Sequence, residues 1–170
     1  MQSCARKMAS YPVVVIATIL AFDAQPAGAD EESGSHGYPH SHLALFAGAG
    51  FEQAKNGHKE DGVALGLEYE YRFEERWGFG ADVEHLSGSG THRSWVAALP
   101  VSFHANDSWR LFAGPGFEIS ETGDKFLVRF GVAYEIPLRS HWSAAPEILV
   151  DFIDGGATSY VVGLTLGRSF

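Results

Sequence analysis

Hydrophobic and polar residues alternate with a period of two along most of the chain after residue 42. The segment 62–73 shows this most clearly, because one set of alternate positions is apolar and the other is small or charged. The apolar set is Val63, Leu65, Leu67, Tyr69, Tyr71 and Phe73, and the other set is Gly62, Ala64, Gly66, Glu68, Glu70 and Arg72. This alternation is that of a β-strand whose two faces meet different surroundings.

The same alternation recurs and predicts an all-β chain. We expect strands over residues 43–52, 62–73, 77–84, 95–103, 109–118, 126–136, 142–152 and 160–170. Polar breaks separate them, with short turns at one set of strand ends and somewhat longer loops at the other. Such a succession is typical of an up-and-down meander. The expected fold is an antiparallel up-and-down β-barrel of about eight strands.

The distribution of side chains favours a transmembrane barrel over a soluble one. A soluble barrel keeps its large apolar side chains inside. Here the apolar face carries nearly all Trp, Tyr and Phe, whereas the other face combines Gly and Ala with Glu, Asp and Arg. A narrow eight-stranded interior suits small residues beside a few charged ones. We therefore expect the apolar face to contact lipid.

Aromatic residues gather near both ends of the expected strands. Near the short turns lie Phe73, Trp77, Phe103, Trp109, Tyr134, Trp142 and Phe170. Near the opposite ends lie Phe51, Trp95, Phe117, Phe126, Phe152 and Tyr160. Two aromatic belts that flank an apolar band are typical of proteins in a membrane.

The first 29 residues have the pattern of a signal peptide. Two basic residues precede an apolar stretch over 13–22, and Ala27-Gly28-Ala29 provides a cleavage site. A transmembrane helix is the alternative, but the stretch has about ten residues where a membrane span needs roughly twenty. We expect a cleaved signal peptide over 1–29, a flexible polar leader over 30–41 and the barrel over 42–170.

The last strand resembles the carboxy-terminal assembly signal of bacterial outer-membrane proteins. The residues that carry this resemblance are Tyr160, Gly163, Leu166 and Phe170. The rest of the segment 43–170 resembles small eight-stranded outer-membrane barrels of the OmpA-like and OmpW-like porin-family type. The resemblance implies the outer membrane of a Gram-negative envelope as location. It also implies outer-membrane lipids and lipopolysaccharide, periplasmic chaperones and the outer-membrane assembly machinery as partners.

Three prolines conflict with uninterrupted strands, namely Pro100, Pro115 and Pro146. Proline donates no ladder hydrogen bond, and a closed barrel has no free edge on which to place it. We expect bulges or locally missing hydrogen bonds at these positions.

The face expected to line the lumen is rich in charge. Its charged residues are Glu68, Glu70, Arg72, Asp82, Glu84, Arg110, Glu118, Arg129, Glu135, Glu147 and Asp151. Buried charges are tolerated when they are paired and hydrogen-bonded. Rough register places Arg129 between Glu118 and Glu147, which predicts that Arg129 is the hub of an internal network. A plugged lumen is the favoured interpretation, and a cation site or a narrow ion path is the alternative.

Two further clusters suggest chemistry. His36, His40 and His42 have spacings that could bring imidazoles onto one divalent metal, although an ordinary polar leader is favoured and we expect no cofactor. His85 and Ser87 share a strand face and resemble the His-x-Ser of outer-membrane lipid A deacylases of the PagL type. The resemblance implies a lipid A-modifying hydrolase at the outer leaflet. The Asn expected after the serine is Gly88 here, and no acidic residue is evidently placed to orient the histidine.

Charge and strand number exclude two classes of function. A formal net charge of -9 argues against nucleic acid as a partner, because binding to phosphate backbones needs clustered Lys and Arg. An open diffusion pore needs roughly sixteen strands. The favoured function is a non-enzymatic integral outer-membrane barrel with an envelope structural role, small cation or ligand binding, or narrow conductance.

Overall fold

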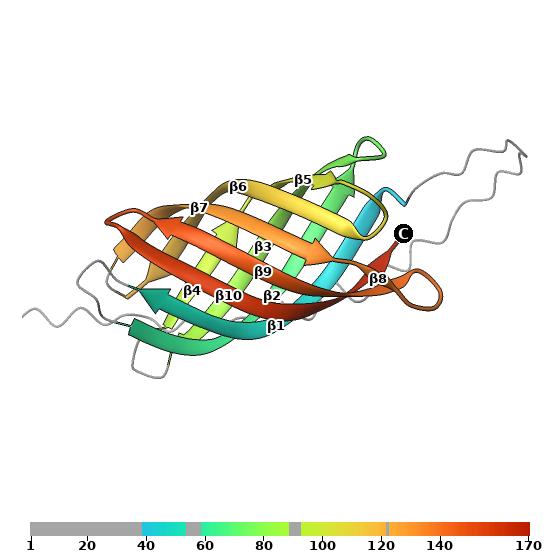
Figure 1. Cartoon of the computed structure of the whole chain (residues 1–170). Helices are drawn as coiled ribbons and strands as arrows, with labels where there is room; N and C mark the ends of the chain where they lie inside the picture. Colours follow the sequence, from blue (N-terminus) through green and yellow to red (C-terminus); the bar gives the residue numbers. More distant parts are fainter. Residues whose placement is uncertain (1–38, 54–58, 89–92, 122) are drawn as a thin grey trace, which may run out of the picture. The chain divides into compact units, whose positions relative to one another are not determined.

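The computed structural model describes residues 39–53, 59–88, 93–121 and 123–170, and these ranges contain only strands and their connections. The strands are β1 Ser41–Gln53, β2 Lys59–Arg72, β3 Trp77–Gly88, β4 Arg93–Ala98, β5 Val101–His104, β6 Trp109–Ser120, β7 Gly123–Tyr134, β8 Ile136–Pro137, β9 Trp142–Ile153 and β10 Ala157–Ser169. Figure 1 shows them side by side around a common interior. Within the same ranges, no helix is long and apolar enough to cross a membrane.

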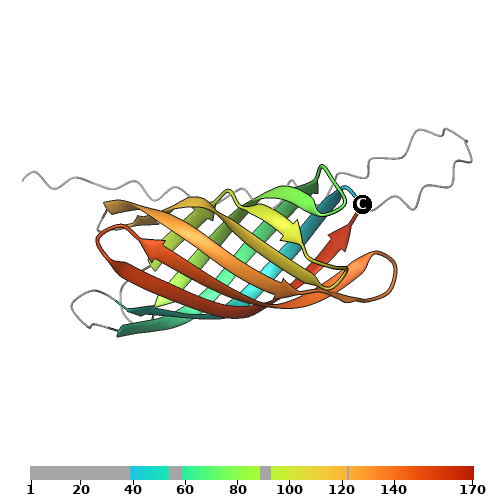
Figure 2. The same cartoon turned by 45° about the horizontal axis from the view of Figure 1, so that its top comes forward.

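The sheet closes on itself. All pairings are antiparallel, and β1 pairs with β2 on one side and with β10 on the other. Because β4 continues into β5 and β7 continues into β8, the ten segments form eight barrel strands (Figure 2). The expected antiparallel up-and-down barrel of eight strands is confirmed.

Both ends of the described barrel meet at one rim, which we call the terminal rim. There the amide of Ser41 donates to the carbonyl of Phe170 at 3.1 Å, and the amide of Phe170 donates back at 2.9 Å. Turns over 73–76, 105–108 and 138–141 close this rim. At the opposite, distal rim, the connections 121–122 and 154–156 are even shorter. The expectation of longer loops was wrong at these two connections, because the strands around them extend further than alternation alone indicated. The other two expected loops, over 54–58 and 89–92, lie outside the described residues.

The two faces of the sheet differ as the alternation predicts. Large apolar side chains point outward and are exposed, whereas most of the charged inward side chains are buried. The outward aromatic rings pack in pairs near the rims. Trp77 and Phe103 have centroids 4.9 Å apart at the terminal rim, and Phe117 and Phe126 have centroids 5.7 Å apart near the distal rim.

The prolines interrupt hydrogen bonds without shifting the strand register. Pro100 lies in the gap between β4 and β5, and the pairing with β3 and β6 has the same register before and after it. Its carbonyl still accepts from the Gly80 amide at 2.8 Å. β6 and β9 continue through Pro115 and Pro146 in unchanged register. The expected local loss of backbone hydrogen-bond donors at the prolines is therefore confirmed. The strands show no bulges at these positions.

Part of the lumen is apolar, which the expected lining of small and charged residues did not include. One buried cluster contains Phe46, Ala64, Phe112, Ala133, Ala145, Leu149 and Val161. A second joins Val96, Leu127 and Ile153, which lie toward the distal ends of their strands. Large side chains fit here because glycines face them: a Cβ at Gly131 would collide with the ring of Phe112.

Candidate functional site: the charged lumen

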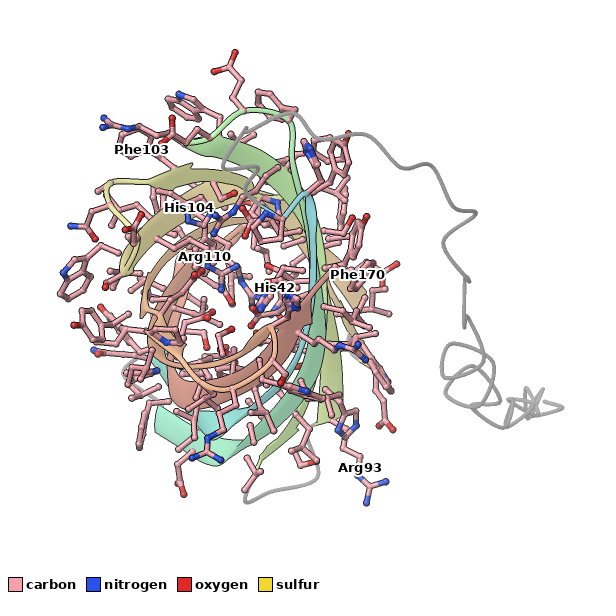
Figure 3. All side chains as sticks on the ribbon, turned by 90° about the vertical axis from the view of Figure 1, so that its right-hand side faces the viewer. His42, Arg93, Phe103, His104, Arg110 and Phe170 are labelled. Atoms are coloured by element: carbon pink, nitrogen blue, oxygen red, sulfur yellow. The ribbon has the colours of Figure 1, made fainter. Side chains whose placement is uncertain are left out.

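The charged residues of the lumen form two clusters, each centred on one arginine. We name them the Arg129 cluster and the Arg110 cluster. Alternation along the strands points their side chains inward, and Figure 3, viewed from the terminal rim, shows Arg110 and His42 inside the ring of strands. The charges lie away from the outward apolar surface.

The Arg129 cluster links three strands across the lumen. Arg129 Nη1 and Nη2 donate to the two carboxylate oxygens of Glu84 at 2.9 and 3.1 Å. Its Nε and Nη2 donate to the two oxygens of Asp151, both at 2.8 Å. Asp82 Oδ2 lies 4.0 Å from Nη1. The side chains of Arg129 and Glu84 have no exposed surface, so this cluster fills its section of the lumen.

The Arg110 cluster gathers four carboxylates around one guanidinium. Nη2 donates to Glu68 Oε2 and to Glu147 Oε2, both at 3.2 Å. Nη1 donates to Glu70 Oε2 at 3.4 Å, and Nε lies 3.6 Å from Glu135 Oε1. The second oxygens of Glu68 and Glu147 are buried without a hydrogen-bond partner among the described residues. Around Arg110 two carboxylates therefore keep an unpaired oxygen, whereas both oxygens of Glu84 and both oxygens of Asp151 accept hydrogen bonds from Arg129.

Glycines on the inward face make room for these charged side chains. A Cβ at Gly78 would lie 2.5 Å from Glu70 Oε1 and 2.8 Å from Ser102 Oγ. A Cβ at Gly66 would lie 2.7 Å from Cγ of Glu84. Glycine and charged residues therefore alternate with apolar ones in the sequence because the inward charged side chains occupy the space that a Cβ would fill.

Glu70, His104 and Glu135 offer ligand atoms within 4.8 Å of one another, which raises the question of a metal site. Arg72 Nη2 donates to His104 Nδ1 at 2.8 Å, and arginine has no acceptor, so Nδ1 carries the lone pair. His104 Nε2 then carries the proton and donates to Glu70 Oε1 at 2.7 Å, where Ser102 Oγ also donates at 2.6 Å. A metal would need a free lone pair on one ring nitrogen, but Nδ1 accepts from Arg72 and Nε2 is protonated. The geometry favours a chain of hydrogen bonds over a metal centre.

The structure corrects the partners expected for Arg129. Glu118 forms its ion pair with Lys125 at 3.6 Å, and Glu147 pairs with Arg110. Arg129 is the hub of one cluster only, with Glu84 and Asp151 as its main partners. The expectation failed because strand register relates only residues on adjacent strands, whereas the hydrogen bonds from Arg129 to Glu84 cross the lumen between strands that are not adjacent.

The histidines of the expected metal cluster do not come together in the described residues. His36 lies outside these residues, and His40 and His42 have separate partners. His40 Nδ1 donates to the carbonyl of Arg72 at 3.0 Å, and its ring stacks against Tyr71. His42 Nε2 lies 3.1 Å from Ser143 Oγ. In the described part of the chain, no group of three metal-ligating side chains includes either histidine.

His85 and Ser87 do come together. Ser87 Oγ lies 3.2 Å from His85 Nδ1, near the distal end of β3. The ring of His85 packs edge-on against Trp95 with centroids 4.7 Å apart. Among the described residues, His85 donates to no carboxylate and forms no ion pair that would complete a catalytic triad.

Sequence reasoning missed three lumen residues with polar contacts. Ser102 and His104 contact Glu70 of the Arg110 cluster, and Lys125 pairs with Glu118 outside both clusters. Parity was an available signal, because Ser102 and His104 alternate with outward Val101 and Phe103. Ser102 lies on the inward parity of the expected strand 95–103 but is uncharged, whereas His104 and Lys125 lie one residue outside the expected strands 95–103 and 126–136.

Comparison with known proteins supports the fold through structure alone. No family model matches the sequence, and no curated protein matches it. Among solved structures, the Neisserial surface protein A (NspA) has a TM-score of 0.62 at 8% identity, covering 76% of this chain and 97% of that one. Ail, the attachment invasion locus protein of Yersinia pestis, in complex with the heparin analogue sucrose octasulfate, has a TM-score of 0.50 at 14% identity, covering 75% and 99%.

The N-terminal β-barrel domain of Pseudomonas aeruginosa OprF gives a similar result. Its TM-score is 0.52 at 8% identity, and the match covers 76% of this chain and 99% of that chain. At such identities the likeness concerns the fold only. This chain has the fold of small eight-stranded transmembrane β-barrels, as its alternation predicts.

Proposed function

We propose that this chain is an integral outer-membrane protein and that its barrel is a non-enzymatic component of the envelope. One observation carries the proposal: the outward surface is apolar and bounded by aromatic side chains, while charged groups are buried in the lumen. A soluble barrel would have the reverse arrangement. Export by the segment 1–29 and removal of that segment belong to the same proposal.

Fractionation and gel mobility test the location. We expect the protein in the outer-membrane fraction, with a faster-migrating folded band that converts on boiling. Amino-terminal sequencing of the mature protein should begin at Asp30. A soluble periplasmic protein with the same mobility before and after boiling would contradict the proposal.

The lumen supports a structural role over conductance. The fully buried Arg129 and Glu84 span it, and the apolar cluster of Val96, Leu127 and Ile153 lies on its distal side. A continuous ion path needs polar groups or water along its whole length. In planar-bilayer recordings, we expect the wild-type barrel to be silent. Steady single-channel currents would instead favour the narrow-conductance alternative.

Hydrolysis of a lipid ester is a second candidate, favoured only by the hydrogen bond between His85 and Ser87. A serine beside a histidine can act as a nucleophile. Lipid A from cells that express the wild type, the Ser87→Ala variant or neither should be compared by mass spectrometry. Identical profiles would remove this candidate, and loss of one acyl chain with the wild type alone would establish it.

A further inference from the structure

The outward face carries a polar group of residues at the distal ends of β3 and β4. Ser87 on β3 is registered directly opposite Arg93 on β4, and His85 is registered opposite Trp95. Side chains directly opposite each other on one face have Cβ atoms about 4.5–5.5 Å apart. We call Ser87, Arg93, His85 and Trp95 the distal polar patch. Elsewhere, the outward surface at mid-strand is mainly apolar.

Arg93 is the charged member of this patch and is available for a partner. Its side chain is exposed, and Figure 3 shows it extending away from the barrel wall. Within the described ranges, no carboxylate forms an ion pair with it. Asp61, on the outward face of neighbouring β2, already has an interaction of its own. The described residues therefore provide no ion-pair partner for Arg93 within the chain.

The other members of the patch add hydrogen-bonding groups and fix its depth. If His85 Nδ1 donates to Ser87 Oγ across the 3.2 Å contact, the serine hydroxyl keeps its own proton for an external acceptor. Trp95 lies in the distal aromatic group, at the depth where amphipathic rings meet lipid headgroups. Arginine offers several N–H donors in a planar fork that matches a phosphate.

We propose that the distal polar patch binds the phosphate of an anionic lipid headgroup in the outer leaflet. Arg93 provides the charge and paired donors, Ser87 provides a further donor, and Trp95 positions the headgroup at the interface. This inference rests on the proposed membrane location. It differs from the hydrolase candidate because it needs no nucleophile and leaves the lipid unchanged.

The full-length mature protein, refolded into vesicles of phosphatidylcholine with or without phosphatidylglycerol, provides the test. The measurement is the temperature at which the folded gel band converts to the unfolded one. We expect phosphatidylglycerol to raise this temperature for the wild type. Arg93→Gln should lose most of the increase, Arg93→Lys should keep part of it, and Ser87→Ala should lose a smaller share.

Arg139→Gln is the matched control, because Arg139 is an exposed arginine in a turn at the terminal rim. It should keep the increase seen with the wild type. The proposal is overturned if the wild type shows no increase, if Arg93→Gln keeps it, or if Arg139→Gln loses it equally. Failure of the wild type to form a heat-modifiable band in any vesicle would instead contradict the membrane location itself.

Discussion

Arg129 on β7 and Glu84 on β3 form a two-bond ion pair across the lumen, between strands that are not neighbours in the sheet. Asp151, from the strand next to β7, completes the set of charge-assisted hydrogen bonds. The pair therefore joins opposite walls of the barrel. Its contribution to the free energy of unfolding should differ from that of the other lumen charges, because all three side chains are buried and all four carboxylate oxygens accept from Arg129.

Removal of this arginine should strongly destabilise the barrel. Arg129→Met would leave Glu84 and Asp151 buried without a cation, and breaking a buried pair costs about 3–5 kcal/mol. Guanidinium unfolding of protein in phosphatidylcholine vesicles, followed by Trp fluorescence, measures this free energy. Arg139→Met in an exposed turn serves as control and should change it by less than about 0.5 kcal/mol. An unchanged midpoint for Arg129→Met would contradict the role assigned to the pair.

Neutralising an acid in the Arg110 cluster should have a much smaller effect. Glu147 shares Arg110 with three other carboxylates, and one of its oxygens has no hydrogen-bond partner among the described residues. Glu147→Gln removes like-charge repulsion while it retains an acceptor for Arg110. We expect a change within about 1 kcal/mol, whereas Glu84→Gln should cost several times more. Equal losses of unfolding free energy for Glu147→Gln and Glu84→Gln would show that the two clusters contribute equally to stability.

The distribution of lumen residues could be predicted from the sequence, but their partners could not. Alternation alone placed Glu84 and Arg129 on the inward face, because side-chain direction depends only on parity along a strand. Their contact depends on strand tilt and on the stagger of the closed barrel. These are properties of the whole sheet. For the same reason, the register between adjacent strands gave Arg129 two partners that belong to other residues.

The apolar part of the lumen shows a second limit of the sequence. Phe112 and Leu127 were on the inward parity, yet small and charged neighbours dominated the pattern. The ring of Phe112 fits in the narrow lumen because Gly131 lies opposite it on the next strand. Such a pairing appears when the register between strands is known.

A side chain added at Gly131 should therefore test the packing of the lumen. Phe112 is registered opposite Gly131, and a Cβ there would overlap its ring. We expect Gly131→Ala to destabilise the barrel by about 1–3 kcal/mol through overpacking. Phe112→Leu should recover part of this loss in the double variant. A double-mutant cycle from guanidinium unfolding gives the coupling, and additive effects would mean that the two positions do not contact each other.

The turn before β9 offers a change that should increase stability. Ser140 and His141 have positive φ values of 53° and 67°, and the amide of Trp142 donates to the carbonyl of Arg139 at 3.2 Å. Two consecutive positive φ angles are the pattern of a type I′ turn, which Asn-Gly adopts with less strain than Ser-His.

Replacing Ser140-His141 by Asn-Gly should therefore raise the free energy of unfolding by about 1 kcal/mol, after the greater freedom of glycine in the unfolded chain is included. Gly155→Ala at the distal rim is the opposite control, because its φ is 89° and a Cβ there meets no other atom within 4 Å. This variant should lower the unfolding free energy by about 1 kcal/mol through backbone strain alone. A loss of stability in the Asn-Gly variant would show that the side chains of Ser140 and His141 contribute more than their backbone strain costs.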